Sequence, residues 1–426
     1  MISLVTSNGK IPEKKRRLKL SAVAFDRPSL YHERVMNKLL ILPVALALAA
    51  GVSNGQTRPR VRESGIVVGV LAPGPLNAIT DVHGVKVGHV TLINGVSVRT
   101  GVTAIVPHGG NVFREKVPAG IAVANGFGKL TGFTQVEELA TIETPIILTN
   151  TLNVPEAAAA LIDYTLTQPG NESVQSVNPV VGETNDGWLN DIRGRHVIRS
   201  DVLRAIAVAD SGPVAEGAVG AGTGTTCFGF KGGIGTASRR LDGQRGGFTV
   251  GVLVQTNFGG VLTMGGLPVG ELLKEEKSSE DPKAVAGGLA PGPPETGGSC
   301  LIVVATDAPL DGRNLRRLAR RALIGIARTG GYYSHGSGDY AVAFSTDTGL
   351  RVTLRPGEMM TGVTLLRDER ISPLFQAAAE AAEEAILNSL FKAETMTGYR
   401  DRTARALPLD RLFEILEKAG RTTFPE

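Results

Sequence analysis

Short apolar runs, broken by glycine, proline and polar residues, make up most of the first two thirds of the chain. Runs of this length that are rich in Val and Ile are typical of β-strands. We therefore expect strands at residues 66–71, 85–93, 102–107, 119–125, 203–209, 246–255 and 260–264. Helices are predicted at residues 134–142 and 155–166, and the second of these opens after Pro155 with an Ala/Leu/Ile face.

The last third of the chain combines apolar runs with longer helical patterns. A buried strand is predicted to begin at Ser299, another at residues 340–345, and an Ala/Leu-rich helix at 373–392. Between the two strands, one apolar stripe recurs at helical spacing: Leu315, Leu318, Ala319, Ala322, Leu323 and Ile326. Strands early and late in the chain, with helices grouped in two places, predict a layered α+β sandwich.

Residues 276–298 interrupt this pattern with a polar stretch that is rich in Pro and Gly, which predicts a long exposed loop. A plain linker is one interpretation of this loop. Because it ends where the buried strand begins, it is equally a candidate for a loop that is cut during maturation.

Composition and charge are ordinary for a soluble protein of 426 residues, with 42% hydrophobic and 20% charged residues. The formal charge of +4 comes from the front of the chain, since residues 1–55 hold nine Lys/Arg against three Asp/Glu. Without them the chain is mildly acidic. This balance argues against nucleic-acid binding.

The front of the chain has the order of a secretory signal. Met36-Asn37-Lys38 is a short positive start, Leu39 to Ala50 is apolar, and small residues follow. We expect Met36 to be the true start, residues 1–35 to be upstream sequence, residues 36–55 to be a signal peptide, and the mature chain to be exported, to the periplasm. A membrane anchor or a buried helix is the competing interpretation.

Several kinds of chemistry find no support in the sequence. The six histidines show no metal-ligand spacing, so no metal is expected. The glycine-rich stretch 217–235 fails as a phosphate loop because Lys231 precedes Gly232 instead of Ser or Thr. Cys227 and Cys300 could pair in an oxidising compartment, but two buried thiols are expected, because Cys300 should point into the core. No cofactor is predicted.

Ser299 is the strongest candidate for a catalytic residue. It follows Gly297-Gly298 and heads a buried strand. If the chain breaks before Ser299, the new α-amino group lies beside its own hydroxyl, and an amine with an ordinary pKa of about 7.7–8.0 can serve as the base. A simple turn before a strand is the alternative.

Three other stretches offer polar groups that suit such a site. Ser337 and Asp339 lie in a glycine-rich turn, where a capping Asp is the plain interpretation. Asn257 lies at a strand end and either caps a turn or donates to an oxyanion. Glu183 belongs to an acidic stretch, 182–191, which would normally be solvated, although an enclosed carboxylate there could hold a substrate ammonium.

Taken together, five segments resemble the DmpA/BapA-type aminopeptidases, a family of N-terminal-nucleophile hydrolases that includes L-aminopeptidase/D-esterases and β-peptidyl aminopeptidases. They span roughly residues 66–392 in the family's order, and they are Asn77–His89, Gly217–Arg239, Val254–Gly260, Gly298–Leu310 and Gly336–Asp339. The resemblance implies a four-layer αββα sandwich of the DmpA/ornithine acetyltransferase type. It also implies cleavage between Gly298 and Ser299 into two chains, 56–298 and 299–426, and a homotetramer.

The resemblance also assigns roles. Ser299 matches the nucleophile, Asn257 the oxyanion-stabilising residue, and Glu183 the carboxylate that contacts the substrate's amine. Ser337 and Asp339 match supporting residues, although Asp339 stands where some relatives have Glu. Asn185, expected beside the substrate, stands where some relatives have a catalytic Tyr.

The function expected on this basis is removal of N-terminal residues from short peptides, amides or esters, including D- or β-amino acid substrates. An acyltransferase of the ornithine acetyltransferase type is the main alternative, although that family uses Thr as its nucleophile. A conventional Ser/His/Asp hydrolase using His335 and a catalytically inactive binding protein are further alternatives.

Overall fold

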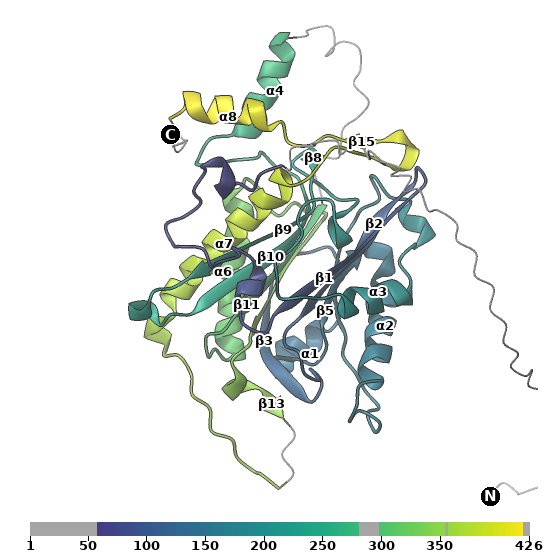
Figure 1. The fold of residues 1–426 in the computed structure, drawn as a ribbon, viewed down its shortest axis with the longest axis vertical. Helices are drawn as coiled ribbons and strands as arrows, with labels where there is room; N and C mark the ends of the chain where they lie inside the picture. Colours follow the sequence, from purple (N-terminus) through teal and green to yellow (C-terminus); the bar gives the residue numbers. More distant parts are fainter. Residues whose placement is uncertain (1–57, 281–297, 354–356, 421–426) are drawn as a thin grey trace, which may run out of the picture. The chain divides into compact units, whose positions relative to one another are not determined.

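The apolar run that begins at Ser299 is a central strand of the larger of two β-sheets in a computed structural model of the chain (Figure 1). The structure describes residues 58–280, 298–353 and 357–420. The expected signal peptide, the upstream residues and positions 281–297 of the expected loop lie outside these ranges.

The larger sheet has seven strands, in the order β13-β3-β12-β11-β10-β9 with β4 paired to β3. Its strands are β3 (Glu115–Gly126), β4 (Thr141–Ile142), β9 (Ile234–Arg240), β10 (Thr249–Phe258), β11 (Gly298–Thr306), β12 (Ser337–Ser345) and β13 (Val352–Thr353). Strands β11 and β12 are parallel to each other, whereas β10 runs antiparallel to β11. This central register positions the nucleophile candidate.

The smaller sheet has the order β1-β2-β5-β6. Its strands are β1 (Lys86–Asn94), β2 (Val98–Val106), β5 (Ile146–Asn150) and β6 (Val180–Thr184). Two short hairpins stand apart from the sheets: β7 (Thr226–Cys227) with β8 (Phe230–Lys231), and β14 (Met396–Thr397) with β15 (Thr403–Ala404).

The α-helices of the described residues lie at the faces and ends of these sheets (Figure 1). They are α1 (Phe133–Leu139), α2 (Val154–Leu166), α3 (Arg199–Ala207), α4 (Val269–Glu280), α6 (Gly312–Arg328), α7 (Ser372–Phe391) and α8 (Leu409–Lys418). The apolar stripe predicted over residues 315–326 is the buried face of α6, and Asp311 caps this helix by accepting from the Asn314 N–H at 2.8 Å.

Three clusters of buried side chains hold the elements together. The first joins one face of the larger sheet to α6 and α7. The second lies between the two sheets, where Leu301 and Val303 of β11 belong to the same cluster as Leu148 of β5. The third joins the smaller sheet to α2 and α3. Because both faces of β11 and β12 are covered, the middle residues of the two strands, 301–305 and 341–344, are apolar, as is typical of buried parallel pairs.

The expected strand at 203–209 is wrong, because these residues belong largely to α3. The side chains of Val202, Ala205 and Ile206 are buried at helical spacing. Asp201 accepts from the Ile198 N–H at 3.1 Å and fixes the start of the helix. Small apolar residues alternate along this segment, which fits a strand as well as a helix. The segment is helical because its buried side chains form one stripe at helical spacing.

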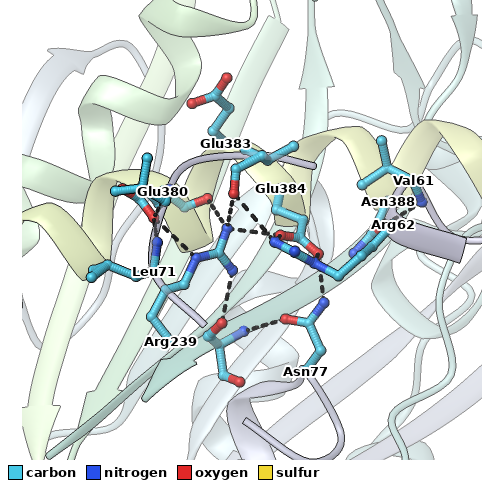
Figure 2. A network of polar contacts seen from close by, with 12 residues as sticks. Val61, Arg62, Leu71, Asn77, Arg239, Glu380, Glu383, Glu384 and Asn388 are labelled. Atoms are coloured by element: carbon cyan, nitrogen blue, oxygen red, sulfur yellow. Dashed lines mark hydrogen bonds and ion pairs between the residues drawn. The ribbon is translucent and has the colours of Figure 1, made fainter. Parts of the chain in front are cut away.

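The expected strands at 66–71 and 260–264 are also wrong. Along 66–71, side chains satisfy the backbone in place of a neighbouring strand: Arg239 donates to the Val68 carbonyl at 2.7 Å, and Glu380 accepts from the Leu71 N–H at 3.0 Å (Figure 2). At 260–264 the chain turns at Gly260, whose φ of +133° suits only glycine.

Several element boundaries differ from expectation. Helix α1 ends at Leu139 and gives way to β4, and α4, which was not predicted, extends into the first residues of the loop expected at 276–298. Strands β5, β6 and β9 and helix α8 were not predicted. The coarse prediction of a mixed α+β fold is confirmed.

Candidate active site

Ser299 is held at the start of β11 by neighbours on both sides. Asn257 of β10 is its antiparallel partner, and Gly338 of β12 is its parallel partner. Ser299 is 5% exposed, and its Oγ accepts a hydrogen bond from the Gly338 N–H at 3.2 Å. The hydroxyl is therefore fixed at the sheet's end.

The residue before Ser299 has to be glycine. Gly298 has a φ of +115°, and a Cβ there would lie 2.1 Å from the carbonyl oxygen of Asn257. Any larger residue would push β11 away from β10 at this point. The peptide bond between Gly298 and Ser299 is thus pressed against the strand that carries Asn257.

Asn257 presents its amide to the same place. In an antiparallel pair, directly opposite residues have side chains on one face with Cβ atoms about 4.5–5.5 Å apart. The Asn257 Oδ1 accepts from the Thr226 N–H at 3.0 Å. This bond orients the side chain, and its Nδ2 has no acceptor among the described residues. A donor is available beside the Ser299 hydroxyl.

Lys231 supports the loop behind Asn257, a role that the sequence analysis missed. The side chain is fully buried, and its Nζ donates to the carbonyls of Gly222, Thr225 and Gly232 at 2.7–3.0 Å. Burial lowers the pKa of Lys231 to about 7. These bonds fix the backbone next to Thr226, whose N–H holds Asn257.

A cavity of about 400 Å³ opens in front of these residues. It draws residues from both sheets and from the β14–β15 hairpin. Its lining is Phe127, Lys129, Thr151, Glu183, Asn185, Gly187, Trp188, Thr226, Asn257, Phe258, Gly298, Ser299, Gly336 and Arg402. The structure therefore brings together five of the predicted site residues: Gly298, Ser299, Asn257, Glu183 and Asn185.

Glu183 is a buried carboxylate in this cavity. It lies on β6, not in a solvated turn, and is 2% exposed. One oxygen accepts from the Lys129 N–H at 3.0 Å, and the other accepts from the Thr151 hydroxyl. Burial raises the pKa of Glu183 above its ordinary value. A cation that entered the cavity would relieve this cost of burial.

Ser337 and Asp339 do not line the cavity. Their partners on β11 are Gly298 and Cys300, so their side chains point to the face of the sheet opposite to that of Ser299. The Ser337 hydroxyl and the Cys300 N–H lie close enough to the Asp339 carboxylate to lower its pKa, against the larger effect of burial. Its contacts reach the backbone of β11, one residue beyond Ser299.

Asp339 is an unusual group for its position. It is 1% exposed, and its Oδ2 has no hydrogen-bond partner among the described residues. Burial raises the pKa of Asp339 to about 6. An unpaired carboxylate oxygen in a closed environment favours a neighbouring cation or a proton.

His335 does not line the cavity that holds the nucleophile candidate, although its neighbour Gly336 does. It is exposed, and its ring contacts Phe127 with ring centroids 6.3 Å apart. Within residues 58–280, 298–353 and 357–420, no hydrogen bond joins His335 to Ser299. The arrangement gives no support to a Ser/His/Asp triad.

Three other features concern the described residues alone. They contain no group of three His, Cys, Asp or Glu side chains that could hold a metal ion. None of their helices is long and apolar enough to cross a membrane. Cys227 and Cys300 are both buried and unbonded, as expected.

Comparison with known proteins gives a consistent result. The sequence profile of Peptidase family S58 matches residues 77–404. A curated relative, the beta-peptidyl aminopeptidase BapA of Sphingosinicella microcystinivorans, is 42% identical over 395 residues, which cover 89% of this chain and 96% of the relative.

Two solved structures agree with this. A Burkholderia sp. beta-aminopeptidase is 42% identical, with a TM-score of 0.77 over 86% of this chain and 100% of its own. The L-aminopeptidase D-Ala-esterase/amidase of Ochrobactrum anthropi, described as a prototype of the serine aminopeptidases with a variant of the N-terminal-nucleophile hydrolase fold, is 36% identical, with the same TM-score and coverage.

Proposed function

This chain belongs to peptidase family S58 and is a hydrolase of the aminopeptidase type, and we propose that its nucleophile is a serine exposed by self-cleavage between Gly298 and Ser299. Its relatives at 36–42% identity are named as aminopeptidases, which favours this function over the acyltransferase alternative. The observation that carries the proposal is the placement of Ser299, Asn257 and the buried carboxylate of Glu183 around one cavity.

Self-cleavage begins with attack of the Ser299 Oγ on the carbonyl carbon of Gly298. The C–N bond breaks, the acyl group moves to the oxygen as an ester, and the nitrogen becomes a free amine. Water then hydrolyses the ester. The products are a larger chain, which ends in the Gly298 carboxylate, and a smaller chain, 299–426, which begins with the Ser299 amine.

Peptide hydrolysis uses the same hydroxyl. The Ser299 α-amine accepts the proton as Oγ attacks the first amide carbonyl of the substrate. The Asn257 Nδ2 donates to the oxyanion. The amine then returns the proton to the leaving group, and water hydrolyses the acyl-enzyme.

Asp339 and Ser337 hold the new amine from the other side of the sheet. Support comes from the proximity of Asp339 to the Ser337 hydroxyl and to the Cys300 N–H, both of which lower its pKa. The unpaired Oδ2 of Asp339 is suited to accept a bond from an ammonium or amine one residue away.

Glu183 makes the activity exo-acting, because it binds the substrate's free ammonium within the same cavity as the nucleophile. Substrates are short peptides, amides or esters with a free amino end, including D- or β-amino acid compounds. Asn185, whose Oδ1 accepts from the Gly187 N–H at 2.9 Å, borders this site.

Replacement of Glu183 by Gln tests this assignment. We expect Glu183→Gln to lower the preference for alanine p-nitroanilide over its desamino analogue, propionyl p-nitroanilide, by about 10- to 100-fold in kcat/KM, because hydrogen bonds to charged groups have this strength. Because burial raises the Glu183 pKa, the wild-type preference should fall with decreasing pH sooner than for an ordinary Glu.

Glu143→Gln is the matched control. Glu143 is also buried, but it accepts from Asn178 and lies outside the cavity lining. Its replacement should leave the preference unchanged. An unaltered preference in Glu183→Gln would remove Glu183 from the site.

Three further properties belong to the proposal. The packing of α6 and α7, two sheets, and α2 with α3 supports a four-layer αββα order, which a crystal structure would test. A homotetramer is expected from the resemblance, and sedimentation of the purified protein as a monomer would exclude it. Export after removal of residues 36–55 is tested by the N-terminus of protein recovered from the periplasm.

A further inference from the structure

Arg402 lines the cavity of Ser299 and Glu183 but belongs to a segment more than one hundred residues later in the chain. Its guanidinium lies over the Trp188 ring, 4.4 Å from the centroid, and Nη1 donates to the Trp188 carbonyl at 3.5 Å. Within the described part of the chain, it forms no ion pair with any carboxylate. Most of its donors have no protein acceptor there.

The backbone places this side chain firmly. The β14–β15 hairpin packs on the turn that carries Trp188, since the Tyr399 N–H donates to the Leu189 carbonyl at 2.7 Å. A Cβ on Gly398 would lie 2.1 Å from that same oxygen.

Two residues directly before Arg402 have unfavourable backbone conformations. Arg400 and Asp401 have φ values of +59° and +56°, in the left-handed region that non-glycine residues rarely adopt. Such strain persists where the surrounding contacts over-determine the backbone, and it concentrates at binding sites. The strained turn aims Arg402 into the cavity.

The charges of the cavity are complementary to a zwitterion. Glu183 is the carboxylate, and Arg402 and Lys129 are the cations of the lining. Stacking on Trp188 leaves the edge of the Arg402 guanidinium free for a planar, two-oxygen acceptor. Lys129 is exposed and lacks such a support.

We propose that Arg402 binds the free C-terminal carboxylate of the substrate, so that dipeptides and other very short peptides with both ends free are the favoured substrate class. This inference rests on the proposed function, in which Glu183 holds the amino end. The cavity of about 400 Å³ suits a short ligand gripped at both ends.

The test compares Ala-Ala and β-Ala-Ala with their C-terminal amides. Wild type should favour the free carboxylate, and Arg402→Gln should lower kcat/KM for the dipeptides by about 10- to 100-fold while leaving the amides almost unchanged. Arg402→Lys, which keeps the charge but not the planar fork, should recover part of the preference.

Arg400→Gln is the matched control, because Arg400 lies in the same hairpin over the Tyr399 ring and does not line the cavity. Its preference should equal that of wild type. Equal losses on dipeptides and amides in Arg402→Gln, or no loss on either, would overturn the role of Arg402.

Failure of the proposed function gives a different result. In that case wild type hydrolyses none of the four compounds, and calorimetric binding of Ala-Ala decides the question of Arg402 alone. Binding that is weaker in Arg402→Gln than in wild type keeps the carboxylate site, and equal binding removes it.

Discussion

At the scale of single residues, Asn257 shows how the fold places a common side chain beside the proposed nucleophile. The proposed nucleophile, Ser299, lies 42 residues further along the chain than Asn257. The antiparallel register sets it opposite Ser299, and the Thr226 N–H occupies its Oδ1, so that the donor end is left to face the cavity.

Loss of this donor should slow the chemistry. We expect Asn257→Ala to lower kcat by about 10²–10³, as is typical of an oxyanion donor, with a smaller change in KM. Steady-state kinetics on alanine p-nitroanilide measures this, and Asn178→Ala, at an exposed position, is the control. A change confined to KM would contradict an oxyanion role.

Asp339 is expected to support activity and, in its ionised form, to lower the stability of the folded state. Its pKa of about 6 lies above the ordinary 3.8, so the folded state disfavours the ionised form. The contribution of Asp339 to folding is therefore most favourable below pH 3.8, and it is lost as pH rises to about 6.

Asp339→Asn should abolish hydrolysis, because the Ser299 amine loses the carboxylate proposed to hold it. The fold should not be weakened, because the substitution removes a buried charge. In the Ser299→Ala background, which keeps the uncleaved chain described here, Asn should raise the free energy of unfolding at pH 8 by up to about 3 kcal/mol and have little effect at pH 4. Urea unfolding at both pH values measures this. An active Asp339→Asn enzyme, or one destabilised more at pH 8 than at pH 4, would contradict the assignment.

Single residues differed in how well the sequence revealed them. Ser299 was recognisable because Gly-Gly precedes it and an apolar run follows. Arg402 and Lys231 were not, because their roles depend on contacts with Trp188 and with loop carbonyls that no local pattern encodes. Glu183 was found, but its strand was missed, since β6 is short and continues into polar residues.

At the scale of elements, the spacing of apolar residues did not settle which segments form strands, whereas burial and side-chain contacts did. The segment 66–71 has the composition of a strand but meets no strand. It is held by Arg239, which also pairs with Glu384 of α7 at 2.7 Å (Figure 2). Burial alone would raise the pKa of Glu384, but Arg62 and Arg239 hold it below the ordinary value.

Removal of Arg239 should therefore destabilise the protein strongly. Arg239→Met leaves Glu380 and Glu384 buried without this partner, and we expect a loss of about 3–5 kcal/mol in the free energy of unfolding. Urea unfolding measures the loss. The added change Glu384→Met should restore part of it, because one of the two buried carboxylates that Arg239 pairs with is then gone.

Arg240→Met is the control for this pair of variants, because the neighbouring arginine is exposed and should contribute within about 0.5 kcal/mol. Equal stability of Arg239→Met and Arg240→Met would show that the network of Figure 2 does not hold segment 66–71.

At the scale of the whole molecule, the site depends on both sheets. Ser299 and Asn257 come from the larger sheet, Glu183 from the smaller one, and Arg402 from a hairpin near the end of the chain. The sequence indicated a layered α+β fold because apolar strands and helices are grouped along it. It could not indicate which strands pair, since β11 and β12 meet only after the α6 crossover.

The central claim is that one peptide bond, Gly298–Ser299, is cut by the chain itself. Denaturing electrophoresis of freshly purified protein, with N-terminal sequencing of the smaller band, tests it most directly. We predict two bands, the smaller beginning with Ser299, and a single inactive band for Ser299→Ala. An unbroken wild-type chain with full aminopeptidase activity would contradict the account.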